Sequence, residues 1–552
     1  VRASVAYPGV LSPIEIDGRL LADGGAADNL PVKAVRAMGA DVVIAVDVAS
    51  SLEDRKNLKN LFSITSQYIN IFLMKSMRAE KESADFVVVP QLLSQDTFQF
   101  ENLIPNFIAG KEVVEGIKKD LIQYSISEKS YEALRAKRLE KRKEKIVVDK
   151  IEVERFSNVD ERSIRQLMTV REGEELQLEK LERDLARIYG TGDFERVNFD
   201  LTGEDARTLK IQASEKSWGP NYLRLHLSWE GEIKGKQDGN AVINWKMTRI
   251  GAFNAHWNSD MSLGTVLEYD SEFYQPIVYS GFIFVAPSFH VSRRDEDFYQ
   301  GAARTGEYEK DSLRGQVDLG FSFRRFGELR AGVSRGFIDY EQEVGQSALP
   351  NFDVSTAAFI YQFTIDQLDS LYFPRAGYFL GATFYDSKKA LGANQDYRKL
   401  SGQVHLFLPL SKVTLFSQFY GGTDLSSDLP VYDLFLTGGL WSFSGYRAEE
   451  IRAQTFGSLR IGVLWELPMR KQILWDRIFL SGWGEYGRFF REPLVGVETM
   501  DSLFSRSAGT FGIGFDTKIG SVFLAYGQSG TAHKQFYISV GRSFGIVSTL
   551  FK

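Results

Sequence analysis

The sequence predicts a chain of three parts, the largest of which is an antiparallel transmembrane β-barrel of about sixteen strands over residues 217–552. Segments of roughly ten residues alternate apolar and polar side chains there, and turn residues separate them. Glycines and aromatic residues also concentrate after about residue 216. The sequence has no continuous run of 18 or more apolar residues, so we expect no membrane-spanning helix.

The side chains of single segments indicate lipid outside the barrel and water inside it. In residues 458–465 the large apolar side chains are Leu459, Ile461, Val463 and Trp465, and they alternate with Ser458, Arg460 and Gly462. A soluble β-sandwich would also alternate. Sixteen strands, however, enclose more space than side chains can fill, so the polar face is predicted to line a lumen.

Residues 1–124 are predicted to alternate β and α. VVIAVDVA (42–49) and ADFVVVP (84–90) are continuous apolar runs of the kind that parallel sheets bury on both faces, and a helical stretch (58–82) lies between them. The strands are too few for a sheet covered on both sides, so we interpret this region as part of an α/β domain. Because Val1 already lies in a segment predicted to be folded, we expect the natural N-terminus to lie upstream.

Two shorter regions connect this part to the barrel. Residues 125–145 contain the charged run EALRAKRLEKRKEK (132–145), which is predicted to be a solvated helix or linker. Residues 146–216 are predicted to fold in the order β-α-α-β-β, from their helical and alternating spacings. This order, with the string YGTGDFERV (189–197), resembles a POTRA domain, the small module that precedes many outer-membrane barrels.

Composition argues against several classes of function. The formal net charge of −6 gives no electrostatic reason to expect a nucleic-acid partner. The sequence contains no cysteine, which removes disulfides, thiolate metal sites and cysteine nucleophiles. Its five histidines are scattered singly. We therefore predict neither a metal site nor a cofactor.

Three strings in the barrel region carry a family resemblance: SEFYQP (271–276), TIDQLDSLYFPRAGYFLGATF (364–384) and FLTGGLWSFSGYRAEEI (435–451). In this order they are similar to landmarks of the BamA/TamA superfamily of sixteen-stranded outer-membrane barrels. The resemblance implies that 435–451 is the sixth extracellular loop, which folds back into the lumen. Eleven candidate strands precede it and five follow it.

The loop departs from the family pattern at one position. Family members carry an Arg before the Gly-aromatic pair, whereas Ser444 precedes Gly445 and Tyr446 here. The resemblance implies an acidic partner on a neighbouring strand, and Glu485 stands where that residue is expected. We hypothesise that Arg447 pairs with Glu485, because an unpaired carboxylate in a narrow lumen would be costly. The alternative is that Arg447 faces solvent.

Residues 3–48 contain the most specific string of the chain, with ASVAYPGVLSP (3–13) followed by ADGG (22–25). They resemble the second half of patatin-like phospholipases. The resemblance implies acyl transfer by a Ser-Asp dyad in which Asp23 is the general base, and Gly24 and Gly25 allow the tight turn that carries it. Asp28 and Asp47 are competing carboxylates. The nucleophilic serine should lie upstream of Val1, so we expect the 552-residue chain to be inactive alone.

A G-x-S-x-G string does occur downstream, as GVSRG with Ser334 at its centre. The helix that should follow a nucleophile serine is missing from this alternating segment. We interpret Ser334 as a small strand residue.

The order of the three parts resembles the patatin-like autotransporters of the type V secretion group (PlpD-type). This implies the outer membrane of a Gram-negative bacterium, a periplasmic POTRA domain and a hydrolase at the cell surface or released from it. Implied partners are outer-membrane lipids, a phospholipid substrate and the outer-membrane assembly machinery; a homo-oligomer is left open. The alternatives are an outer-membrane insertase or transporter without lipase activity, and a scaffold with an inactive hydrolase domain.

Overall fold

The structure is a computed structural model that describes residues 3–541, apart from 7–12, 17, 50–51, 53–60, 93–103, 142–144, 155, 157–158, 204–205, 218, 233–236, 301–302, 324–325, 346–349, 371, 426, 469–474, 491–502 and 518–519. The part YPGVLS of the patatin-like string and the start of the helix expected at 58–82 thus lie outside the described residues. The chain divides into two units, Val1–Glu144 and Lys145–Lys552. Of the helices described, none has the length and apolar character needed to cross a membrane.

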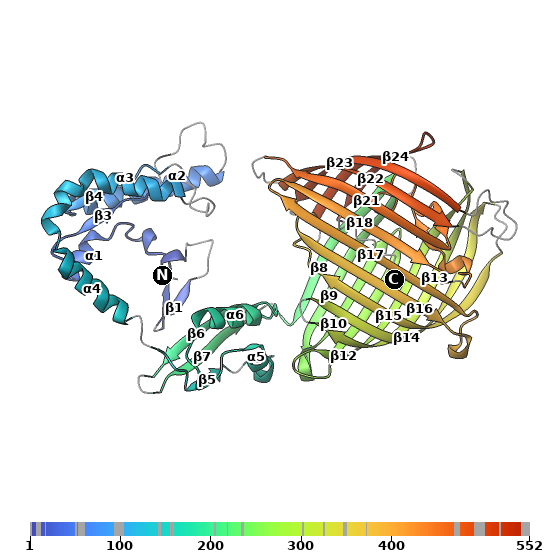
Figure 1. The fold of residues 1–552 in the computed structure, drawn as a ribbon, viewed down its shortest axis with the longest axis horizontal. Helices are drawn as coiled ribbons and strands as arrows, with labels where there is room; N and C mark the ends of the chain where they lie inside the picture. Colours follow the sequence, from blue (N-terminus) through green and yellow to red (C-terminus); the bar gives the residue numbers. More distant parts are fainter. Residues whose placement is uncertain are drawn as a thin grey trace. The chain divides into compact units, whose positions relative to one another are not determined.

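The first unit shows the predicted alternation of β and α, drawn in blue and cyan in Figure 1. An antiparallel pair, β1 with β2, comes first, and β3 later pairs in parallel with β4. The elements are β1 (Ile14–Ile16), β2 (Arg19–Leu21), α1 (Val32–Ala37), β3 (Ile44–Val46), α2 (Leu61–Glu82), β4 (Phe86–Val88), α3 (Ile104–Leu121) and α4 (Glu128–Lys141), with short 3-10 turns η1 (Ala3–Val5), η2 (Gly24–Ala26) and η3 (Ile122–Tyr124).

Strand β3 is covered on one face only, unlike the expectation from its apolar run. Ala45 is buried, whereas Ile44 and Val46 are 49% and 52% exposed. The buried face packs on Leu30, Val32, Val43 and Met77. The exposed face stays open because no described element lies over it.

Asp85 fixes the start of β3. Its Oδ2 accepts hydrogen bonds from the amide of Val43 (2.7 Å) and from Nη2 of Arg36 (2.6 Å). The hydrogen bond from the Val43 amide, and to a lesser extent the Arg36 guanidinium, hold the pKa of this carboxyl below its usual value. Asp85 therefore stays charged and connects α1 to the sheet.

Residues 132–141 of the charged run belong to helix α4, in agreement with the predicted solvated helix. The described side chains of this helix, 128–138, are all exposed. A helix with no apolar face against a neighbour is a solvated spacer.

Residues 145–216 form what we call the βααββ module, in the predicted order. Its elements are β5 (Lys150–Val153), α5 (Glu161–Leu167), α6 (Leu178–Tyr189), β6 (Phe194–Thr202) and β7 (Thr208–Glu215). Strand β7 lies in the middle of the sheet, parallel to β5 and antiparallel to β6. The module has its own core, which includes Val148, Ile164, Leu181, Ile188, Phe194, Leu209 and Ile211.

A buried carboxylate connects the two helices of the module. Asp184 on α6 is fully buried and accepts hydrogen bonds from the amides of Thr169 (2.6 Å) and Val170 (2.9 Å) and from the Thr169 hydroxyl (2.7 Å). Arg187 forms an ion pair with it. These bonds hold the chain that leaves α5 against α6.

We expect Asp184→Ala to destabilise the module by about 1–3 kcal/mol, because it leaves the buried amide of Val170 without its acceptor. The measurement is hydrogen–deuterium exchange of α6 in the whole chain, which reports the free energy of local opening. Glu182→Ala, at an exposed position of the same helix, is the matched control and should change little. Equal protection in the two variants would contradict the assignment.

Residues 221–540 form a closed barrel of sixteen antiparallel strands, which confirms the predicted fold (Figure 1). The chain closes where β25 meets β8, with four paired residues, 229–232 against 537–540. The strands are β8 (Asn221–Glu232), β9 (Gln237–Ile250), β10 (Ala255–Gly264), β11 (Leu267–Pro276), β12 (Ile283–Gln300), β13 (Ala303–Ser322), β14 (Gly327–Gly345), β15 (Phe352–Asp366), β16 (Gly377–Ser387), β17 (Tyr397–Leu410), β18 (Val413–Thr423), β21 (Thr455–Glu466), β22 (Trp475–Phe490), β23 (Leu503–Thr517), β24 (Gly520–Ser529) and β25 (His533–Val540).

The two faces of the barrel wall carry the side chains that the alternation predicts. Leu459, Ile461, Val463 and Trp465 of β21 are exposed on the outer face, while Ser458 and Arg460 are buried on the inner face. Apolar side chains stay outside because lipid, unlike water, imposes no cost on them.

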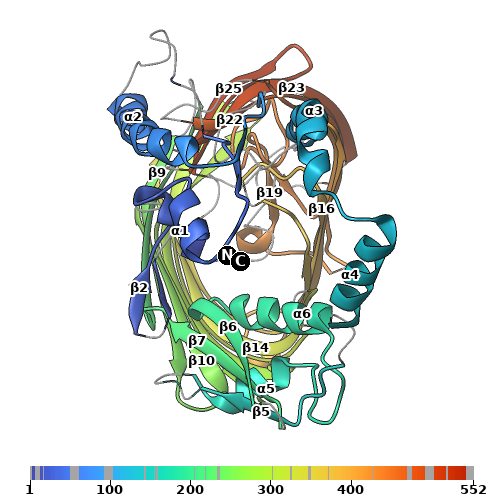
Figure 2. The same ribbon diagram turned by 90° about the vertical axis from the view of Figure 1, so that its left-hand side faces the viewer.

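The segment between β18 and β21 enters the lumen, as the family resemblance implies. It contains the short hairpin β19 (Phe435–Thr437) and β20 (Ile451–Ala453), and Figure 2 shows β19 within the ring of barrel strands. Eleven barrel strands precede this segment and five follow it, as predicted. We call residues 434–454 the lumen loop.

Candidate functional site

Asp23 caps the turn that follows β2. Its Oδ1 accepts a hydrogen bond from the Gly25 amide (2.9 Å), and its own amide donates to the carbonyl of Ala6 (3.0 Å). The side chain is half-buried. These bonds fix the carboxylate with Oδ1 on the turn.

The two glycines after Asp23 differ in their surroundings. A Cβ atom on Gly25 would lie 2.9 Å from Oδ1 of Asn29 and 3.2 Å from Oδ1 of Asp23, whereas one on Gly24 would meet open space. A side chain at Gly25 would therefore displace the side chain of Asn29 and crowd the carboxylate of Asp23, whereas Gly24 has room for one. A catalytic contribution of Gly24 stays a prediction.

The competing carboxylates have structural partners. Oδ1 of Asp28 accepts from the Leu30 amide (3.3 Å), and Oδ1 of Asp47 accepts from the Ala49 amide (2.9 Å). Asp47 is buried and forms an ion pair with Lys81 of α2. Both carboxylates thus have structural contacts, and the role of Asp23 as the general base stays a prediction.

The lumen loop is bonded to the barrel wall at Glu485, the residue that the family pattern indicated. Oε2 of Glu485 accepts from the amide (2.7 Å) and the hydroxyl (2.5 Å) of Ser444. The Ser444 hydroxyl also accepts from Oγ1 of Thr510 (2.5 Å). Ser444 therefore contacts the acidic residue from the position that an Arg holds in the family pattern.

The predicted pairing of Arg447 with Glu485 is wrong, because Arg460 holds Glu485 instead. Nε of Arg460 donates to Oε1 of Glu485 (2.5 Å), and the two side chains are only 2% and 1% exposed. They lie directly opposite each other on β21 and β22. The guanidinium of Arg447 lies over the ring of Tyr299, 5.7 Å from its centroid.

Gly445 and Tyr446 hold the tip of the lumen loop against strands β24 and β25. The Gly445 amide donates to the hydroxyl of Tyr537 (2.8 Å), which donates to the carbonyl of Tyr446 (2.7 Å). Gly445 has a φ of +88°, and a Cβ there would lie 2.6 Å from the amide nitrogen of Ser529. Only glycine fits this position.

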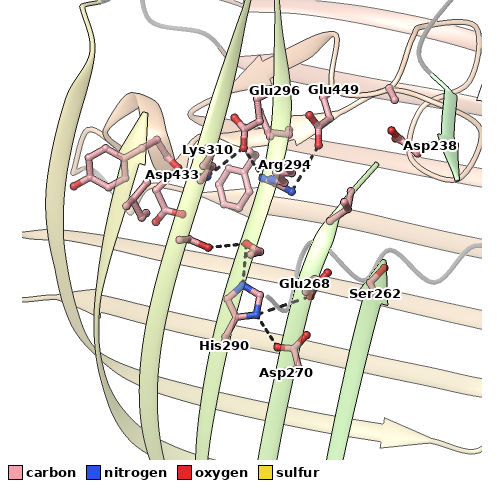
Figure 3. A pocket seen from close by; sticks show the side chains of 18 of the residues that line it. Asp238, Ser262, Glu268, Asp270, His290, Arg294, Glu296, Lys310, Asp433 and Glu449 are labelled. Atoms are coloured by element: carbon pink, nitrogen blue, oxygen red, sulfur yellow. Dashed lines mark hydrogen bonds and ion pairs between the residues drawn. The ribbon is translucent and has the colours of Figure 1, made fainter. Parts of the chain in front are cut away.

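A second buried charge cluster, which the sequence did not indicate, holds the base of the loop. Glu296 is buried and contacts Arg294 (2.5 Å), Lys310 (3.2 Å) and Arg452 of the loop (3.4 Å). The Tyr340 hydroxyl also donates to it (2.6 Å). Figure 3 shows Glu296 between Arg294 and Lys310 at the wall of a lumen cavity of about 960 Å³.

Ser334 lies in the middle of β14 and is buried. Strand β14 pairs with the next strand, β15, and the described residues between these two strands contain no helix. The structure confirms that it is a strand residue.

A profile of the Omp85 superfamily domain matches residues 262–544, just over half of the chain. The chain belongs to the Omp85 superfamily. BamA from Haemophilus ducreyi, in a crystal structure lacking POTRA domains 1–3, aligns with a TM-score of 0.56 at 14% identity, over 72% of this chain and 85% of that one. At this identity the likeness shows the fold alone. A sixteen-stranded barrel of this superfamily is an outer-membrane protein of a Gram-negative bacterium.

The N-terminal segment of this Omp85 protein matches another family. A patatin-like phospholipase profile covers residues 1–36. An uncharacterized NTE family protein of Mycobacterium bovis is 53% identical over 51 residues, which are 9% of this chain and 14% of that protein. The lysophospholipase NTE1 of Saccharomyces cerevisiae is 49% identical over 55 residues, 10% of this chain and 3% of that one. The chain thus joins a patatin-like segment to an Omp85 barrel but spans a small part of these relatives.

Proposed function

We propose that this Omp85 protein carries a patatin-like acyl hydrolase and that its module and barrel export or anchor that hydrolase. The observation that carries the proposal is the Asp23 turn, because it lies in the segment that matches patatin-like and NTE proteins and is continuous in sequence with the barrel. The proposed domains are the C-terminal part of the hydrolase (1–124), a charged linker (125–145), a POTRA domain (146–216) and the barrel (217–552).

In this proposal Asp23 is the general base of a Ser-Asp dyad. A serine hydroxyl supplied by a patatin half ahead of residue 1 would give its proton to Oδ2 of Asp23 and attack the acyl carbonyl of a phospholipid. Water would then release the fatty acid from the acyl-serine, leaving a lysophospholipid as the other product. Residues 1–22 contain no G-x-S-x-G string, so we expect the 552-residue chain to release no fatty acid by itself.

The barrel and module supply the carrier in this proposal. One βααββ module precedes the barrel in the described part of the chain. The lumen loop is fixed to the wall by the buried Glu485 and Glu296 clusters, which suits a closed barrel that holds a passenger at the membrane. The alternative remains an outer-membrane insertase or transporter in which the N-terminal segment has no enzymatic role.

Trypsin treatment of intact cells tests the surface location of the hydrolase. The exposed Lys and Arg residues of α4 are cleavable if this segment lies outside the cell. We expect an antibody against residues 1–124 to lose its signal on the full-length band in intact cells, before the outer membrane is permeabilised. A variant with Gln at the Lys and Arg positions of 128–145 should lose the cuts in this segment. Protection of the N-terminal part in intact cells would favour the insertase alternative.

A further inference from the structure

Three side chains with metal-binding chemistry meet on the lumen wall, away from the loop clusters. Asp270 of β11 lies directly opposite His290 of β12 in the strand register. Glu268 precedes Asp270 by two residues, so the alternation of the strand puts both carboxylates on the same face. All three residues line the lumen cavity, and Figure 3 shows both carboxylates on the side of one ring nitrogen of His290.

The separations of the three groups match what one small divalent ion requires. Nδ1 of His290 lies 2.6 Å from Oδ1 of Asp270 and 3.9 Å from Oε1 of Glu268. One ligand atom from each residue falls within 4.8 Å of the other two. Ligands of a tetrahedral Zn²⁺, each about 2.0–2.2 Å from the ion, lie roughly 3.3 Å apart. The observed separations bracket this value, so small side-chain rotations are sufficient.

The other ring nitrogen of His290 is held by a hydroxyl chain. Nε2 lies 3.2 Å from Oγ of Ser292, and that oxygen lies 2.7 Å from Oγ of Ser312. When a metal replaces the proton on Nδ1, a proton on Nε2 would donate to Ser292, and the lone pair of Nδ1 would be free to bind the ion. Metal-binding histidines are commonly oriented in this way by a hydrogen bond from the second nitrogen.

We propose that Glu268, Asp270 and His290 bind one Zn²⁺ ion on the lumen wall. An imidazole favours zinc and its neighbours in the transition series over Mg²⁺ and Ca²⁺, and two carboxylates neutralise the charge of the ion. The cavity in front of the residues gives water access to the remaining coordination position. The sequence alone predicts no metal site, because scattered histidines do not reveal their cross-strand neighbours. The proposal is independent of the hydrolase.

Zinc binding by the purified whole chain in detergent, measured by calorimetry after removal of metals, tests this site. We expect one Zn²⁺ per chain, and His290→Ala should weaken the affinity at least about tenfold. Asp270→Asn should also weaken the affinity for Zn²⁺, and it tests the site independently if His290→Ala fails to fold. Co²⁺ should give a visible absorption band in the wild type that His290→Ala loses.

His226→Ala is the matched control, because His226 lines the same cavity from β8 without belonging to the cluster. Its affinity for Zn²⁺ should equal that of the wild type. The proposal is overturned if the wild type shows no saturable binding, if His290→Ala binds as tightly as the wild type, or if His226→Ala loses as much affinity. Heat-modifiable migration in SDS gels verifies that each barrel is folded.

Discussion

Replacing Asp23 with Asn is expected to lower kcat/KM for ester hydrolysis at least about 100-fold, since a positioned general base contributes about 10²–10⁴-fold. The amide has the same shape and keeps an oxygen that can accept from the Gly25 amide, so the turn persists. It cannot, however, accept the serine proton. The measurement uses a fluorogenic acyl ester and protein that carries a serine-bearing patatin half ahead of residue 1, encoded upstream or fused.

Asp28→Asn and Asp47→Asn are the controls for this prediction. The side chain of Asp28 accepts from the nearby backbone amide of Leu30, and Asp47 is held in the ion pair with Lys81. Asp28→Asn should keep near wild-type activity. Asp47→Asn should lower the stability of the protein more than its rate of ester hydrolysis. Activity that survives Asp23→Asn and disappears with Asp28→Asn would show that Asp28 is the base.

The barrel could be predicted from the sequence because the membrane imposes a simple pattern on each strand. Lipid on one side and water on the other force alternation, so the pattern by itself assigns Arg460 to the inner face and Leu459 to the outer face. The position of the lumen loop was predicted from the resemblance of residues 435–451 to the sixth extracellular loop of the family, with which the strand count agreed. Local patterns carried this information, and no long-range contact was needed.

Contacts between strands could not be predicted in the same way. Arg460 and Glu485 are 25 residues apart in the chain but directly opposite in the sheet. The hypothesis chose Arg447 because it is adjacent to the family motif in the sequence. Aligning β21 with β22 through their hairpin would have placed Arg460 across from Glu485. The same alignment of β11 with β12 brings His290 to Asp270.

The burial of strand β3 was also predicted incompletely from the sequence. Its apolar run predicted burial on both faces, and in the described residues only the face of Ala45 is covered. An apolar run reports what a strand can bury and not which element covers it.

Arg460→Ala is expected to destabilise the barrel by about 3–5 kcal/mol, because it leaves the buried carboxylate of Glu485 without its cation. Arg460 also donates to Oε1 of Gln418 (3.0 Å) and to the carbonyl of Leu440 in the lumen loop (3.1 Å), so the loop should loosen together with the wall. The measurements are the temperature at which the folded band disappears in SDS gels and the protease resistance of the loop.

Arg447→Ala is the matched control for Arg460→Ala, because it also removes one arginine from the lumen. The Glu450 carboxylate is bound by the backbone amide of Arg447 (2.7 Å), and alanine keeps this amide. The contact of the Arg447 guanidinium with the ring of Tyr299 is lost, so we expect a small change in barrel stability.

The double variant Arg460→Met with Glu485→Gln should recover part of the stability that Arg460→Ala loses, because it removes both buried charges at once. If Arg447→Ala destabilised the barrel as much as Arg460→Ala, the ion pair between Arg460 and Glu485 would not be the main charge interaction that stabilises the barrel and its loop.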